Sequence, residues 1–154
     1  MTSLTATITS PVEIHKGSKN SKSIKLSLAE YPEFSFDLDG VAYSSTDKKA
    51  FINDHETGDK INVLITTEIY EKKLTKERDL AFWDKTNNYK FISIYGLKDD
   101  NRAYLTLDTY NKAKLSDSKL GVWFSLIISV FIFGAGIYTL REWQKLKRKD
   151  AHML

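Results

Sequence analysis

The chain contains no cysteine among its 154 residues. Disulfides, thiolate nucleophiles and cysteine-ligated zinc sites are therefore excluded. Glycine is also scarce: four glycines precede residue 120, and no two of them are neighbours. The glycine-rich loops that cradle nucleotide phosphates are thus missing. We expect no nucleotide or other cofactor.

Side chains that bind metals are few and scattered. The three histidines are far apart and lack the spacing of metal ligands; they are His15, His55 and His152. We interpret all three as solvated loop or tail residues, and we assign no metal-binding residues.

Carboxylate clusters and catalytic motifs give no clearer signal. Neither the sequence DLDG at 37–40 nor the acidic residues of 54–59 completes the twelve-residue loop of an EF-hand. No G-x-S-x-G sequence places a serine at a strand-to-helix turn. We assign no catalytic residues and expect the protein not to be an enzyme.

Net charge of either sign is missing from residues 1–119, which hold 18 basic and 18 acidic side chains. The whole net charge of +3 lies in residues 141–154. A domain without net positive charge lacks the attraction for phosphates on which nucleic-acid binding depends. We therefore expect no nucleic-acid partner.

The chain does contain a long uncharged run. Residues 120–140 have the sequence LGVWFSLIISVFIFGAGIYTL. At about 1.5 Å per residue this segment spans about 30 Å as a helix, which is the thickness of the hydrocarbon core of a bilayer. The sequence predicts a soluble domain at 1–111, a linker at 112–119, a transmembrane helix at 120–140 and a basic tail at 141–154.

The flanks and faces of this segment fit a membrane helix. Trp123, Tyr138 and Trp143 are placed as aromatic interface anchors. Small residues allow a second helix to approach closely, so a homo-oligomer or a partner helix is weighed against a solitary anchor; they are Gly121, Ser125, Ser129, Gly134 and Gly136. Five basic residues of the tail are expected to contact lipid headgroups; they are Arg141, Lys145, Lys147, Arg148 and Lys149.

The orientation in the membrane is argued from two opposing observations. The tail has five Lys or Arg near the helix and the upstream side three, which favours a cytoplasmic C-terminus. However, the first 30 residues lack the apolar run of a signal peptide, and residues 1–119 carry 36 charged side chains that export would have to move. We expect a tail-anchored protein with a cytoplasmic domain, with the opposite orientation as the alternative.

Alternating apolar residues predict strands along residues 1–111. The alternation is clear at residues 4–8, 24–28 and 61–65, and we extend the last of these strands to residue 74. Asp39-Gly40 between two alternating runs predicts a type I′ hairpin. Residues 91–97 and 102–107 predict a second hairpin with its turn at 98–101, and residues 75–90 predict a short helix or packed loop.

Six or seven short strands predict a mainly β fold, a small antiparallel barrel or sandwich of the OB or SH3-like kind. Aromatic residues on these strands are interpreted as core, with a protein-binding face as the functional remainder. The expected function is that of a single-pass membrane-anchored binding or scaffold domain, an accessory subunit of a membrane-associated complex. The alternatives are a small-ligand or lipid sensor, an immunity-type protein and a membrane-bound hydrolase.

Overall fold

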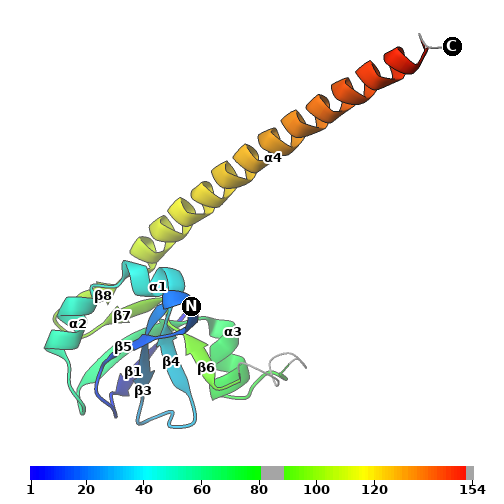
Figure 1. The fold of residues 1–154 in the computed structure, drawn as a ribbon. Coiled ribbons are helices and arrows are strands. Elements are labelled where there is room, and N and C mark those ends of the chain that lie inside the picture. Colours follow the sequence, from blue (N-terminus) through cyan, green and yellow to red (C-terminus); the bar gives the residue numbers. More distant parts are fainter. Residues whose placement is uncertain (81–88, 152–154) are drawn as a thin grey trace. The chain divides into compact units, whose positions relative to one another are not determined.

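The computed structural model of the chain describes residues 1–80 and 89–151 (Figure 1). The chain divides into two compact units, Met1–Lys114 and Leu115–Leu154. The first unit contains all strands of the described part and the hydrophobic core. The described part of the second unit, residues 115–151, is helical.

Four antiparallel strands form the first sheet of the first unit, in the order β1-β5-β7-β8. They are β1 (Thr2–Thr7), β5 (Lys60–Ile65), β7 (Gly96–Lys98) and β8 (Ala103–Leu105). In β5, Ile61, Val63 and Ile65 are fully buried, and the residues between them lie on the opposite face. This confirms the alternation predicted for residues 61–65.

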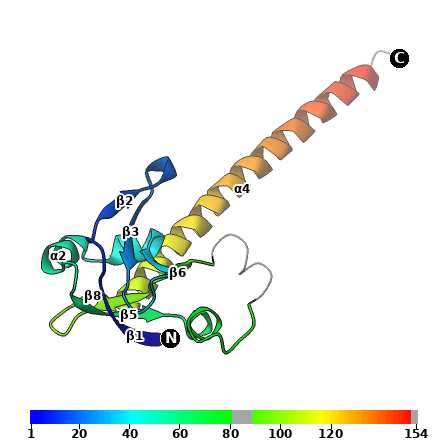
Figure 2. The same cartoon turned by 90° about the horizontal axis from the view of Figure 1, so that it is seen from below.

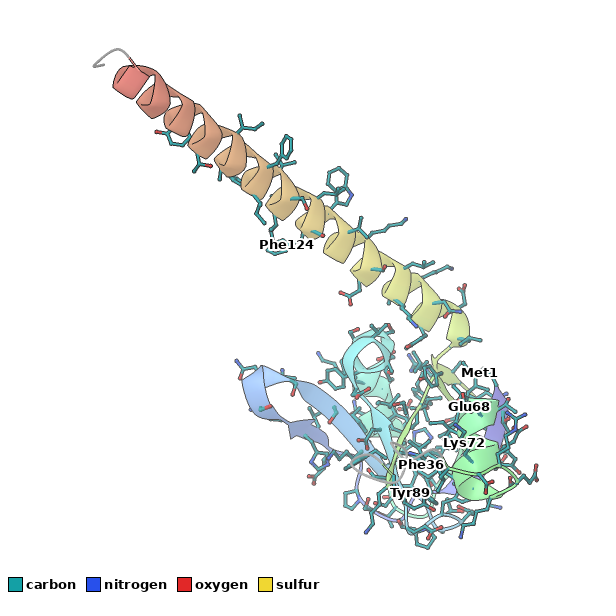
Figure 3. All side chains as sticks on the ribbon, turned by 90° about the vertical axis from the view of Figure 1, so that its right-hand side faces the viewer. Met1, Phe36, Glu68, Lys72, Tyr89 and Phe124 are labelled. Carbon is teal, nitrogen blue, oxygen red and sulfur yellow. The ribbon has the colours of Figure 1, made fainter. Side chains whose placement is uncertain are left out.

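The second sheet has the order β2-β3-β4-β6 and is mixed. It contains β2 (Ile14–Lys16), β3 (Lys22–Ser27), β4 (Ser35–Leu38) and β6 (Phe91–Ser93). The first three strands are antiparallel, whereas β6 runs parallel to β4 with Phe36 opposite Ile92. Figure 3 labels Phe36, which is fully buried.

Hydrogen bonds and the path of the chain connect the two sheets. An isolated bridge pairs Ile8 with Leu28, and the segment from β6 to β7 passes from one sheet to the other. Along that segment, the Ile94 N–H donates to the Asp37 carbonyl and the Tyr95 N–H donates to the Leu64 carbonyl. The described part of the domain is therefore a pair of antiparallel-rich sheets with helices and not a closed barrel, so the OB or SH3-like barrel offered by the sequence is not confirmed.

Two short helices replace the hairpin predicted at Asp39-Gly40. The helix α1 (Gly40–Ser45) follows β4 directly, and α2 (Lys48–Asp54) comes next. A type I′ turn needs positive φ at both central residues. Asp39 instead has an extended φ of −125° and lies at the N-cap position, and only Gly40 has positive φ, at +46°. The hairpin prediction was wrong.

The strand predicted to reach residue 74 ends at Ile65. Helical turns follow it, α3 (Thr67–Ile69) and the π-helical turn η2 (Tyr70–Leu74). The Thr66 hydroxyl accepts the Ile69 N–H at 3.3 Å, which caps the start of α3. Figure 3 shows Glu68 and Lys72 together on this segment, where they form an ion pair at 2.6 Å. Of the short helix or packed loop predicted at 75–90, residues 75–80 and 89–90 form no helix, and residues 81–88 lie outside the described residues.

The turn of the hairpin predicted at residues 91–107 is confirmed, because β7 and β8 pair antiparallel across it. Its first strand was predicted to run through residues 91–97, but β6 pairs with β4 in the second sheet, and only β7 belongs to the hairpin. The last helix, α4 (Leu107–Ala151), begins before the predicted linker, and residues 112–119 are helical. Thr106 and Thr109 cap the start of α4, each side-chain oxygen accepting the other residue's N–H at 3.1 Å. A short 3₁₀ turn, η1 (Ser18–Asn20), joins β2 to β3.

Candidate functional site

The helix α4 contains a stretch that is long enough and apolar enough to cross a membrane. Eighteen consecutive residues of this stretch have a mean hydropathy of 2.2, and none of them is buried inside the structure. Trp123 and Tyr138, two of the predicted interface anchors, are both 67% exposed. Figure 3 shows the ring of Phe124 pointing away from the helix axis.

The small residues predicted to permit helix packing lie on the same helix. A Cβ atom added at any of Gly121, Gly134 or Gly136 would meet no other atom within 4 Å. The Ser129 hydroxyl donates to the Ser125 carbonyl at 2.8 Å, so its polar atom is satisfied within the helix. The described structure leaves space for a second helix beside these three glycines, and helix pairing stays a prediction.

The basic tail continues α4, whose helical backbone reaches Ala151. The side chains of Arg141, Lys145, Lys147, Arg148 and Lys149, with that of Trp143, lie outside the described part of the structure. Their predicted contacts with lipid headgroups stay predictions.

A cavity of about 450 Å³ lies against the second sheet and the η2 turn. Its floor includes a cross-strand row in which Lys25 of β3 is opposite Asp37 of β4, and Asp37 is opposite Ser93 of β6. Asp39 and Phe91 add a carboxylate and an aromatic ring. The cavity therefore presents groups of both charges beside an apolar surface.

Two lysines, Lys25 and Lys73, line this cavity. Lys73 is buried, and its ammonium donates to the Phe91 carbonyl at 2.7 Å. The Lys25 ammonium lies 5.2 Å from the centroid of the Phe91 ring. Burial raises the pKa of Asp37, although the Ser35 hydroxyl, which donates to it at 2.7 Å, and Lys25 partly offset this effect.

A groove of about 320 Å³ lies along the first sheet and the start of α4. Its lining is mainly apolar and includes Leu64, Leu97, Leu105 and Leu107. Asn62, Lys98 and Thr106 supply polar atoms. An apolar floor with polar groups around it is typical of surfaces that bind proteins or small apolar ligands.

His55 is the clearest correction among the polar residues. It is only 8% exposed, although the sequence suggested a solvated loop. Its Nδ1 lies 3.2 Å from the Phe51 carbonyl and its Nε2 lies 3.3 Å from Asp99. The ring also packs edge-on against Tyr104, with centroids 5.1 Å apart.

Tyr104 connects this histidine to two carboxylates. Its hydroxyl lies 2.9 Å from Asp99 and 3.1 Å from Asp54. Burial raises the pKa of Tyr104 strongly, and the two carboxylates raise it further. The Tyr104 hydroxyl therefore stays protonated and serves as a hydrogen-bond donor.

Asp99 is held in its ionised form. Burial opposes ionisation, but the N–H groups of Arg102 and Asn101, the Tyr104 hydroxyl and the electrostatic interaction with His55 outweigh burial and lower the pKa of Asp99. The Tyr104 hydroxyl and the Asp99 carboxylate connect Asp54 and His55, at the C-terminal end of α2, to the β7–β8 turn. The arrangement therefore works as a clamp between α2 and the β7–β8 turn.

Arg102 extends the clamp toward solvent. Its Nη2 donates to Asp47, the N-cap residue of α2, at 2.6 Å, and its Nη1 lies 3.8 Å from Asp54. The guanidinium carbon lies 5.6 Å from the centroid of the Tyr104 ring. No local sequence pattern indicates this network, because its members come from positions 47–55 and 99–104 and meet only in the folded domain.

Among the described residues, no group of three or more His, Cys, Asp or Glu side chains is arranged to hold a metal ion. Asp59 has a structural role, since its carboxylate accepts the Glu56 N–H at 2.8 Å.

The chain was compared with protein-family models, curated proteins and solved structures, and none of them matches.

Proposed function

We propose that the protein is a single-pass membrane protein whose β-rich domain binds another protein, as an accessory or scaffold subunit of a membrane-associated complex. The observation that carries this proposal is the apolar stretch of α4. None of its 18 most apolar consecutive residues is buried inside the structure. A free apolar surface of this length would aggregate in water. The bilayer is the environment that suits it.

The groove along the first sheet supports the protein-binding part of the proposal. Leucines line it, and Ala103 lies exposed at its edge on β8. Rigid strands form its floor, which favours binding without reorganisation. The His55–Asp99–Tyr104 clamp holds the β7–β8 hairpin, and therefore one side of the groove, against α2.

Site-specific photo-crosslinking in cells that make the protein tests this proposal. A photoreactive amino acid replaces Ala103 in the full chain, and a matched control replaces Ala29, which is exposed on the β3 side of the domain. We expect a discrete crosslinked partner from position 103, and loss of that crosslink when Leu107 is changed to Lys. The same products from positions 103 and 29, or none from either, contradict the proposal.

A second candidate function is small-molecule sensing, which the 450 Å³ cavity favours. Its paired carboxylates, lysine and aromatic ring suit a compact ligand that carries a cation. Native mass spectrometry of the full chain released from detergent tests this candidate. A retained small molecule that is lost in Asp37→Asn but kept in the exposed control Asp100→Asn supports sensing, and a bare mass contradicts it.

A further inference from the structure

The β2–β3 hairpin concentrates positive charge at one end of the domain. Residues 9–29 contain four lysines and one acidic residue, Glu13. The rest of residues 1–119 carries 14 basic and 17 acidic side chains. The domain has no net charge, yet this hairpin is a positive pole on an otherwise net negative domain.

The geometry of the hairpin exposes this charge. All three residues of β2 are exposed, and Ile14 is 43% exposed. Lys16 of β2 lies directly opposite Lys22 of β3, and η1, which contains Lys19, joins the two strands. Figures 2 and 3 show the hairpin projecting from the other strands of the first unit.

Folding of the domain does not account for this pattern. Like charges directly opposite each other in an antiparallel pair are destabilising. Within the described part of the chain, neither Lys16 nor Lys22 makes an ion pair. Three lysines and an exposed isoleucine on a projecting ribbon are instead suited to an anionic surface outside the domain.

We propose that the β2–β3 hairpin docks on the anionic lipid headgroups of the membrane that α4 enters, an inference that rests on the proposed membrane anchoring. The tether supports this choice of partner over an acidic protein or a nucleic acid. From Leu107 to Leu120 the chain is helical and spans only about 20 Å. This short tether gives the hairpin a high effective concentration at the membrane surface, so its lysines can reach an anionic leaflet without association from solution.

The experiment uses the full chain reconstituted in lipid nanodiscs. Because the chain has no cysteine, the Ser18→Cys variant in η1 accepts a single fluorophore at the end of the hairpin. The discs contain phosphatidylcholine alone, or phosphatidylcholine with about one third of phosphatidylglycerol. A nitroxide on the lipid headgroups quenches the fluorophore when the hairpin lies on the bilayer surface.

We expect stronger quenching in the anionic discs than in the neutral discs, and we expect added salt to reduce it. Replacing the three distal lysines by glutamine should lower the ratio of docked to free hairpin on the order of 100-fold; the variant is K16Q/K19Q/K22Q. A control with three exposed lysines elsewhere should keep the quenching; it is K49Q/K60Q/K90Q.

Folding does not confuse this result, since the glutamine variant removes the Lys16–Lys22 repulsion and should unfold no earlier than the parent chain. Quenching that is equal in the two kinds of disc, or unchanged in the glutamine variant, overturns the docking proposal. Loss of quenching in both triple variants also overturns it, because it assigns the effect to overall charge. A chain that does not enter the discs contradicts the membrane anchoring itself.

Discussion

At the scale of single residues, the Tyr104 hydroxyl is the centre of the polar clamp. Tyr104→Phe leaves Asp99 and Asp54 without this donor, and we expect it to lower the free energy of unfolding by about 2 kcal/mol. Tyr43→Phe is the control, since no hydrogen bond of its hydroxyl is found among the described residues. Denaturant unfolding of the full chain in detergent measures both variants, and equal effects contradict the role of the clamp.

Asp99 makes the clamp sensitive to acid. Its pKa in the folded domain lies below its ordinary value of 3.8, which the unfolded chain regains. The stabilisation is therefore present above about pH 4 and is lost as the pH falls through the lower, folded pKa. We expect the free energy of unfolding to fall below pH 4 in the parent chain and to depend less on pH in Asp99→Asn. Parallel pH profiles would show that Asp99 does not contribute.

His55 illustrates what residue-level sequence reasoning missed. Its neighbours in sequence, Asp54 and Glu56, suggested a solvated acidic loop. Its partner Asp99 lies 44 positions away and reaches it only because the β7–β8 hairpin packs against α2. Local composition holds no information about such a contact. The burial of alternating residues such as Ile61 and Val63 was predictable, because their period appears in the sequence itself.

At the scale of elements, the start of α1 depends on Gly40, whose φ of +46° favours glycine. We expect Gly40→Ala to lower the free energy of unfolding by about 1 kcal/mol, because an L side chain is strained at this backbone angle. Gly40→Asn should cost less, since asparagine tolerates left-handed angles better. Thermal unfolding compares the two variants. A Gly40→Ala variant as stable as the parent chain would show that the angle is not required.

Strands were easier to predict than the helices between them. The β7–β8 hairpin and β5 follow from alternation and turn residues. In contrast, Asp39-Gly40 is compatible with a hairpin turn and with a helix N-terminus, and the structure has the helix, with Ala42 of α1 buried in the core. The parallel pairing of β4 with β6 joins residues more than 50 positions apart, and no local pattern encodes it.

At the scale of the whole molecule, charge in the middle of the apolar segment should prevent insertion. Val130 is 72% exposed on α4 and lies at the centre of residues 120–140. Val130→Arg should make membrane insertion less favourable by about 3 kcal/mol. Lys114→Arg, outside the apolar run, is the control and should leave insertion unchanged. The membrane-bound fraction of each variant measures the effect, and equal fractions would contradict a role for residues 120–140 in insertion.

The division of the chain into a β-rich domain and an apolar helix depends on composition over tens of residues, and for that reason the sequence predicts it. Charge is frequent in residues 1–119 and absent from 120–140. The path of the chain between the two sheets was not predictable, because it depends on contacts such as the bridge from Ile8 to Leu28.

The central claim, that α4 lies in a bilayer, is tested most directly by alkaline carbonate extraction of membranes from cells that make the full chain. Carbonate removes proteins held at membrane surfaces by charge and leaves proteins that span the bilayer in the pellet. We predict that the full chain stays in the pellet and that a chain ending at Lys119 moves to the supernatant. Recovery of the full chain in the supernatant would contradict the account.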